Sequence, residues 1–128
     1  MKRPAFPLYA ETWLSDADLT VMGASGRAIY LDLLLRCWND GGIPEPDGSA
    51  AGWARLAALG RADSPAQARK AWDAIKDKFT KKTDGTLTNA KLESVRADLD
   101  AHARRRSESA ANAAQARWQP HVRRTDSA

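Results

Sequence analysis

The chain has 128 residues, of which 43% are hydrophobic and 28% are charged, and its formal net charge is +4. This length has room for one domain with a short tail, and no apolar run is long enough for a signal peptide or a membrane span. The single cysteine, Cys37, cannot form a disulfide within the chain, and we expect it to be a buried small hydrophobe.

The excess positive charge lies in the C-terminal quarter of the sequence. Residues 1–100 hold 14 basic and 14 acidic side chains, whereas residues 101–128 hold six basic and two acidic ones. Such asymmetry indicates a polyanionic partner, although a solvated basic tail is the commoner explanation. We therefore expect a domain over residues 1–100 and, over residues 101–128, a basic Ala/Arg-rich helical extension with a flexible tail.

The first predicted element is an N-terminal arm. The stretch from Pro4 to Asp16 carries two prolines and three aromatic residues, which is typical of an extended segment that packs aromatic side chains onto a domain. Ser25 is the expected N-cap of a first helix, which is apolar nearly all round and so is predicted to be central and buried. The run Asn39-Asp40-Gly41-Gly42 is expected to end this helix.

Two more helices follow in the predicted order. Ser49 is the expected cap of the second helix, and Gly60 closes it. Ser64-Pro65 begins the third, because proline is tolerated at the first helical position. Apolar residues at spacings of three and four predict that the third helix runs to Phe79.

Beyond this helix the helical period breaks. Two short threonine-rich runs flank Asp84-Gly85, which is a strong signal for a hairpin with a two-residue turn, and Ile43-Pro44 is long enough only for a strand fragment. A helix resumes after Asn89, with apolar anchors as far as Leu99. No large apolar residue follows before Trp118, so a helix there has no core of its own to bury.

The order arm, helix, short strand, helix, helix, hairpin, helix predicts a fold that is mainly α with a small β-hairpin wing. We interpret it as a winged helix-turn-helix followed by a long C-terminal helix. The turn Gly60-Arg-Ala-Asp-Ser64 is short and begins with glycine, as the helix-turn-helix requires. In such a fold the third helix can enter the major groove of DNA, and the hairpin lies against the phosphate backbone or the minor groove.

Aromatic, glycine and leucine positions recur at a characteristic spacing along most of the chain. They are Tyr9…Trp13-Leu14…Asp18-Leu19, Gly26-Arg-Ala-Ile-Tyr30-Leu-Asp-Leu-Leu34…Trp38…Gly42-Ile-Pro44, Ala54-Arg-Leu-Ala57…Gly60, Trp72…Phe79, Asp84-Gly85-Thr-Leu…Asn89-Ala-Lys-Leu92 and Ala114-Gln-Ala-Arg117-Trp118. Over residues 4–118 this pattern resembles the YdaU-like domain of phage and prophage proteins. The resemblance implies a winged-helix module found near phage replication genes, often at the front of chains that resemble replication initiators or helicase loaders.

The expected DNA contacts come from the third helix and the turn before it, from the hairpin, and from the C-terminal extension. Outward donors near the start of the third helix can reach base edges or phosphates, whereas Asp73 and Asp77 on that helix count against deep insertion. A solvated charged surface remains the alternative for each group. The candidate DNA-binding residues are Arg61, Gln67, Arg69, Lys70, Lys76, Lys81, Lys82, Arg104, Arg105 and Arg106.

A second interpretation uses the same scaffold without DNA. It is a protein–protein interaction module that binds and modulates a host enzyme, replication factor or defence complex, and Asp73 and Asp77 favour it. Trp118 lacks apolar neighbours in the sequence, which suits an anchor for a partner, a fold-back onto the domain, or a homodimer through the alanine-lined C-terminal helix.

The sequence carries no catalytic constellation. His102 and His121 lie in the basic extension with no further ligand at metal-site spacing, and no phosphate-cradling glycine loop is present. We therefore expect a non-enzymatic protein with no cofactor, no metal and no membrane partner. Its expected partner is double-stranded DNA in the cytoplasm of a bacterial host cell.

Overall fold

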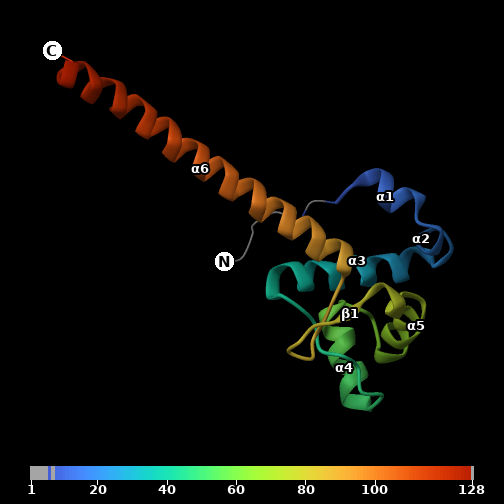
Figure 1. The fold of residues 1–128 in the computed structure, drawn as a ribbon. Coiled ribbons are helices and arrows are strands. Elements are labelled where there is room, and N and C mark those ends of the chain that lie inside the picture. Colours follow the sequence, from blue (N-terminus) through green and yellow to red (C-terminus); the bar gives the residue numbers. More distant parts are fainter. Residues whose placement is uncertain (1–5, 7, 128) are drawn as a thin grey trace. The chain divides into compact units, whose positions relative to one another are not determined.

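The computed structural model describes residue 6 and residues 8–127, with side chains described as far as residue 118. This part of the chain is mainly helical, with a small two-stranded antiparallel sheet and a long last helix, as the sequence predicts (Figure 1). The elements are α1 (Ala10–Ser15), α2 (Ala17–Val21), α3 (Gly23–Asp40), α4 (Ala50–Leu59), α5 (Pro65–Ile75), the 3-10 helix η1 (Lys76–Lys78), β1 (Thr80–Lys81), β2 (Leu87–Thr88) and α6 (Ala90–Ser127).

The chain divides into two compact units, Met1–Glu93 and Ser94–Ala128. In the first unit α3 is the central helix, and its Leu33 and Cys37 are fully buried, as expected. The apolar face predicted for the third helix is buried along α5, where Ala68 and Ile75 have no exposed surface. Full burial of a large aliphatic side chain such as that of Ile75 stabilises the fold by about 1.5–3 kcal/mol. The packing of α5 on α3 and α4 therefore holds the unit together.

Three helix starts are capped by the side chains that the sequence favours. The Oγ atoms of Ser49 and Ser64 accept hydrogen bonds of 3.0 and 3.1 Å from backbone N–H groups three residues ahead, at the starts of α4 and α5. Asn89 does the same for α6, through a 3.0 Å bond to its Oδ1. At the end of α3, Gly41 has φ 88°, a left-handed conformation that favours glycine, and so it ends the helix as predicted.

The prediction of an extended arm from Pro4 to Asp16 is wrong for residues 10–15, which form α1, and α2 follows at Ala17–Val21. Asp16 separates the two helices and caps α2, since its Oδ1 accepts from the N–H groups of Asp18 at 2.9 Å and Leu19 at 3.3 Å. The prolines that suggested an arm lie before Tyr9, and positions 4, 5 and 7 lie outside the described residues. They therefore do not prevent the following residues from forming helix.

Two of the three aromatic side chains of this N-terminal segment pack on the body of the first unit, whereas Tyr9 is 56% exposed. Phe6 meets the ring of Trp38 edge-on at 5.7 Å, and Trp13 stacks on Tyr30 at 5.9 Å. The prediction that Ser25 caps the first helix is also wrong, because α3 begins at Gly23. Gly23 has φ 80°, which lets the chain pass directly from α2 into α3, so no serine cap is needed.

The third predicted helix ends earlier than expected. Apolar spacing suggested a helix as far as Phe79, but α5 stops at Ile75, and η1 follows. Phe79 is extended and still buried, with its ring 6.0 Å from that of Tyr30 and 5.3 Å from that of Trp72. The tighter turn of η1 therefore places Phe79 in the core, where the helical spacing predicts an apolar residue.

The hairpin forms, but the predicted two-residue turn is wrong. Lys82 and Thr86 close a three-residue loop, with hydrogen bonds from Lys82 N to Thr86 O at 2.7 Å and from Gly85 N to Lys82 O at 3.1 Å. Gly85 has φ 87°, the left-handed position of such a loop. Asp84 accepts from Thr86 N at 2.9 Å, which stabilises the longer loop.

The expected strand fragment before α4 is a single paired residue. Ile43 forms an antiparallel bridge with Leu87, through hydrogen bonds of 2.9 and 2.7 Å in the two directions. Since Leu87 also pairs with Lys81 of β1, the lateral order is Ile43, β2, β1. The hairpin is thereby joined to the segment between α3 and α4.

In the second unit α6 continues as an uninterrupted helix. Residues 104–118 are all exposed, and the side chains of residues 119–128 lie outside the described part. Within the residues described, no helix combines the length and apolar character that a bilayer crossing requires.

Candidate nucleic-acid interface

The first half of α5 presents two exposed basic side chains. The guanidinium of Arg69 lies over the ring of Trp53, 5.5 Å from its centroid, and Lys70 is exposed beside it. Trp53 belongs to α4 and is half-buried, so its ring is fixed by the fold. A guanidinium stacked on an aromatic ring keeps its N–H groups available for an acceptor while losing little conformational freedom on binding.

Two of the predicted contacts near this helix are used inside the fold. The side-chain oxygen of Gln67 accepts a 2.7 Å hydrogen bond from the backbone N–H of Asp63, which completes the cap of α5. Arg61 donates two 3.0 Å hydrogen bonds to the carboxylate of Asp32 on α3, and these bonds raise the pKa of Arg61 above its ordinary value. Arg61 also has φ 52°, a backbone conformation unusual for a residue other than glycine.

The lysines of the hairpin are also held by acceptors of their own unit. Lys81 lies 3.1 Å from a carboxylate oxygen of Glu45, and the ammonium of Lys82 donates a 2.7 Å hydrogen bond to the carbonyl of Gly41. Lys82 also lies 3.8 Å from Asp84. A phosphate would have to compete with these partners. The hairpin lysines are therefore less available for DNA than the sequence predicts.

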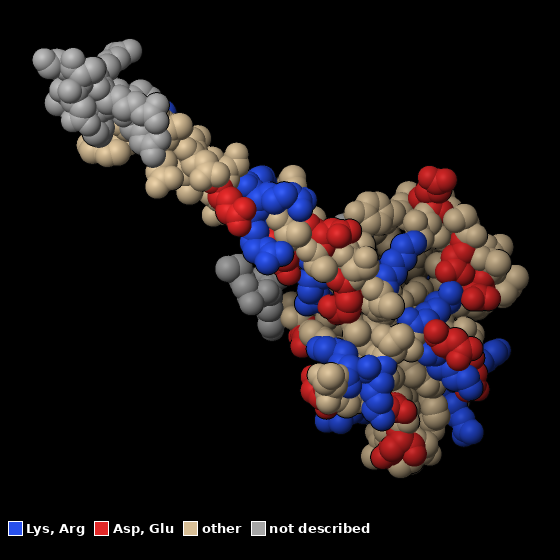
Figure 2. Space-filling model, viewed as in Figure 1, with Lys and Arg blue, Asp and Glu red and all other residues tan. Residues whose placement is uncertain are grey.

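The second half of α5 and η1 carry charges of both signs. Asp73, Lys76 and Asp77 are all exposed, so the positive charge of Lys76 is flanked by carboxylates. On the face drawn in Figure 2, basic and acidic groups are interspersed rather than gathered into one basic field. Among the candidate residues of the first unit, Arg69 and Lys70 are therefore better placed to attract phosphates than Lys76, Lys81 and Lys82.

The densest group of exposed arginines lies on α6. Arg104, Arg105 and Arg106 are in the interior of that helix, and each side chain is exposed. Trp118, the predicted partner anchor, lies farther along the same helix and is 68% exposed. These arginines belong to the second unit and the α5 donors to the first, so each group is described by itself.

Lys78, which is not among the residues that the sequence singled out, is a partly buried cation with two acidic partners. The ammonium of Lys78 lies 2.9 Å from Asp16 and 3.2 Å from Asp18, and it approaches the ring of Tyr30 at 6.0 Å. Burial works to lower the pKa of Lys78, but the hydrogen bonds and charges of the two aspartates outweigh it and raise the pKa. Lys78 thus fastens α2 to η1. Lys78 and Asp16 are 62 residues apart in the sequence, so no local sequence signal predicts their contact.

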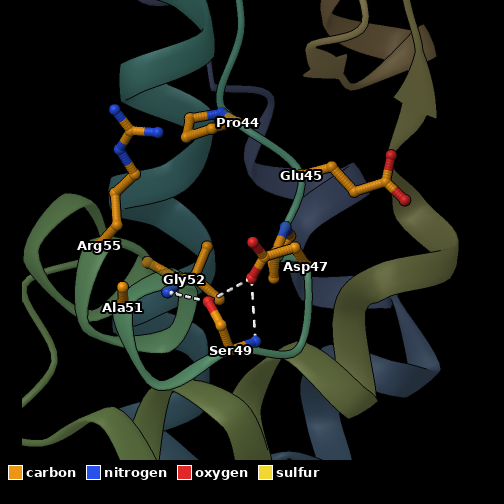
Figure 3. Close-up of a pocket in the computed structure, with 9 residues that line it drawn as sticks. Pro44, Glu45, Asp47, Ser49, Ala51, Gly52 and Arg55 are labelled. Atoms are coloured by element: carbon orange, nitrogen blue, oxygen red, sulfur yellow. Dashed lines mark hydrogen bonds between the residues drawn. The ribbon is translucent and has the colours of Figure 1, made fainter.

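A surface pocket at the start of α4 is a poor small-molecule site (Figure 3). Its volume of about 230 Å³ is below the range of about 300–1,000 Å³ typical of such sites. Its polar groups are engaged with one another, because Ser49 donates to Asp47 and accepts from the N–H of Gly52. Arg55 lines the pocket and is exposed.

The described residues offer no metal centre, since no three His, Cys, Asp or Glu side chains gather closely enough to hold an ion. Comparisons with protein-family models, with curated proteins and with solved structures found no match to the chain.

Proposed function

We propose that this chain is a phage or prophage DNA-binding protein whose first unit is a winged helix-turn-helix. The observation that carries the proposal is the bridge between Ile43 and Leu87. It places a strand residue between α3 and α4 beside a hairpin that follows α5, with the lateral order Ile43, β2, β1. Helix, strand, helix, helix and a two-stranded wing in this arrangement are typical of winged-helix domains, which bind duplex DNA through the third helix.

The distribution of uncommitted cations supports duplex binding through phosphates. On α5, Arg69 and Lys70 are exposed and lie in its N-terminal half, which is the part that contacts DNA in helix-turn-helix proteins. The carboxylates of Asp73 and Asp77 disfavour insertion of the whole helix, since they would be repelled by phosphates. We infer non-catalytic binding in which α5 contributes few base contacts and the arginines of α6 add phosphate contacts.

The biological setting follows from the resemblance to YdaU-like domains. That resemblance supports a role in phage DNA replication or its regulation, in the cytoplasm of the bacterial host. Most of the matching positions set the fold. The resemblance therefore supports the winged helix more strongly than it supports a particular step of phage replication.

A titration of the purified chain with a duplex at about 50 and 200 mM salt tests the proposal. For a protein that makes four phosphate contacts, the logarithm of the affinity falls with the logarithm of the salt concentration with a slope (the salt slope) of about −3.6. The affinity is therefore expected to fall roughly a hundredfold between the two conditions. Lys70→Gln is expected to reduce the slope by about one. The matched control is Lys81→Gln, whose lysine is paired with Glu45 and is expected to change the slope less. Absence of duplex binding at 50 mM salt contradicts the proposal.

The second candidate function is a protein-interaction module, and the exposed apolar residues of α1 and α2 favour it. Leu14 is 76% exposed and Val21 is 82% exposed, although side chains of this kind usually lie inside. A pull-down from host lysate in the presence of nuclease separates the two functions. A partner that is retained with nuclease and lost in the Leu14→Ser variant supports the interaction module, whereas recovery that nuclease abolishes supports DNA.

A further inference from the structure

Residues 101–118 of α6 combine arginines with small side chains on a continuous helix. Seven of these residues are alanine. Glu108 is the one acidic side chain among them, and it lies four residues after Arg104, a spacing at which opposite charges pair on a helix surface, so the carboxylate is offset by an arginine. The basic cluster lies 14 residues after the start of α6, so it is not at a helix end. The arginines are therefore held at fixed angles around a rigid rod.

Three successive arginines on a helix point in three directions. Each residue advances about 100° around the axis, so Arg104 and Arg106 point about 100° to either side of Arg105. A flat surface can meet only one or two of these side chains. A groove with a floor and two charged walls can meet all three.

The direction of Arg105 is shared by a row of polar and small residues. Ser109, Asn112 and Ala116 follow it at spacings of four, three and four, which keeps them within about 60° of one another around the helix. Arginine and asparagine are the side chains that form paired hydrogen bonds with guanine and adenine, respectively. Serine and alanine between them allow the backbone of the helix to approach a surface closely.

We propose that residues 102–117 of α6 lie in the major groove of duplex DNA. Arg105 and Asn112 face the base edges, and Arg104 and Arg106 face the phosphates of the two opposite strands. The major groove of B-form DNA is about 12 Å wide and admits an α-helix of about 10–12 Å diameter, whereas the major groove of A-form RNA is too narrow. This assignment rests on the proposed function for its partner, duplex DNA, but it gives base reading to α6 rather than to α5.

The test uses the full chain and two adjacent arginines as a matched pair. A preferred duplex is selected from a random pool, and affinities are measured for it and for a scrambled duplex. Arg105→Gln and Asn112→Ala are expected to lower the ratio of the two affinities about tenfold or more. Arg104→Gln removes the same charge one position away, and it is expected to weaken binding to both duplexes equally and leave the ratio unchanged. Glutamine is a good helix former, so these variants keep α6 intact.

A modified duplex checks the groove directly. Replacing guanine by 7-deazaguanine removes the N7 acceptor in the major groove, so it is expected to weaken the wild-type chain but not Arg105→Gln. The proposal is overturned if Arg104→Gln and Arg105→Gln alter the ratio alike, if no duplex is preferred, or if a single strand or an RNA hairpin binds as tightly. Duplex binding that Lys70→Gln weakens but the α6 variants leave unchanged overturns this inference alone. Failure of the wild-type chain to bind any duplex overturns the proposed function as well.

Discussion

The ammonium of Lys82 donates a 2.7 Å hydrogen bond to the carbonyl oxygen of Gly41, across 41 residues of sequence. Gly41 is the C-cap of α3, where backbone carbonyls lack helical partners and the helix dipole favours a cation. Lys82, which the sequence predicts to contact phosphates, therefore joins the hairpin to the end of the central helix.

The first prediction separates structural lysines from binding lysines. Lys82→Met is expected to lower the free energy of unfolding by about 1 kcal/mol, because the hydrogen bond to Gly41 is lost. Its effect on duplex affinity is expected to be small. Lys70→Met is expected to show the reverse, with weaker binding and unchanged stability. Urea denaturation and duplex titration of both variants check this, and a loss of affinity confined to Lys82→Met would contradict it.

The second prediction concerns the pH dependence of the contact between α2 and η1. Burial works to raise the pKa of Asp16, but hydrogen bonds from Lys78 and from the N–H of Leu19, with the charge of Lys78, outweigh it and lower the pKa below 3.8. A carboxylate with a lowered pKa in the folded state stabilises that state above its ordinary pKa. This stabilisation is lost as the pH falls through the lowered value.

Asp16→Asn isolates this ionic contribution, because asparagine also caps helices well. The wild-type chain is expected to be more stable than the variant at pH 6, and the difference is expected to shrink below pH 3.8. Urea unfolding at pH 6 and at pH 3 measures it. An equal difference at both pH values would show that the ion pair with Lys78 does not contribute.

The third prediction concerns Gly60, at the end of α4. A Cβ atom at this position would lie 2.9 Å from Cγ2 of Ile29 and 3.5 Å from Cγ of Leu33, so α3 leaves no room for it. Gly60 has φ −86°, which any residue adopts, so the expected cost of Gly60→Ala is steric, about 1–3 kcal/mol. The double variant Gly60→Ala with Ile29→Ala removes this overlap. Its loss of stability is therefore expected to be smaller than the sum of the losses in the two single variants.

The fourth prediction concerns removal of the C-terminal extension. Deleting residues 101–128 is expected to leave the first unit folded, since its buried apolar residues end at Leu92. The deletion removes six basic and two acidic side chains, so duplex affinity and its salt dependence are expected to fall. Circular dichroism melting and duplex titration provide the two readouts. Unfolding of the truncated chain would show that the extension belongs to the core.

The features that the sequence predicted well are those set by near neighbours. Ser49 and Ser64 cap helices through groups three residues away, and Gly41 ends α3 through its own left-handed backbone. Buried positions on α5 followed from helical spacing in the same way. Each of these depends on residues that are close in the chain, so composition and spacing suffice.

The state of the candidate binding residues could not be predicted in this way. Arg61 is engaged by Asp32, 29 residues away, and Lys82 by the carbonyl of Gly41. A cation in the sequence carries no sign of whether a distant acceptor already holds it. The cap that Asp16 forms at the start of α2 is local and could have been predicted, whereas its contact with Lys78, 62 residues away, has no sign in the nearby sequence.

The unbroken course of α6 limits the length of any sequence that it can read. From Arg105 to Ala116 the helix rises about 16 Å, at about 1.5 Å per residue. Successive base pairs are about 3.4 Å apart, so this row spans about five base pairs, or half a turn of duplex. A recognition sequence longer than that would require either a second DNA-contacting element or two chains bound at adjacent half-sites.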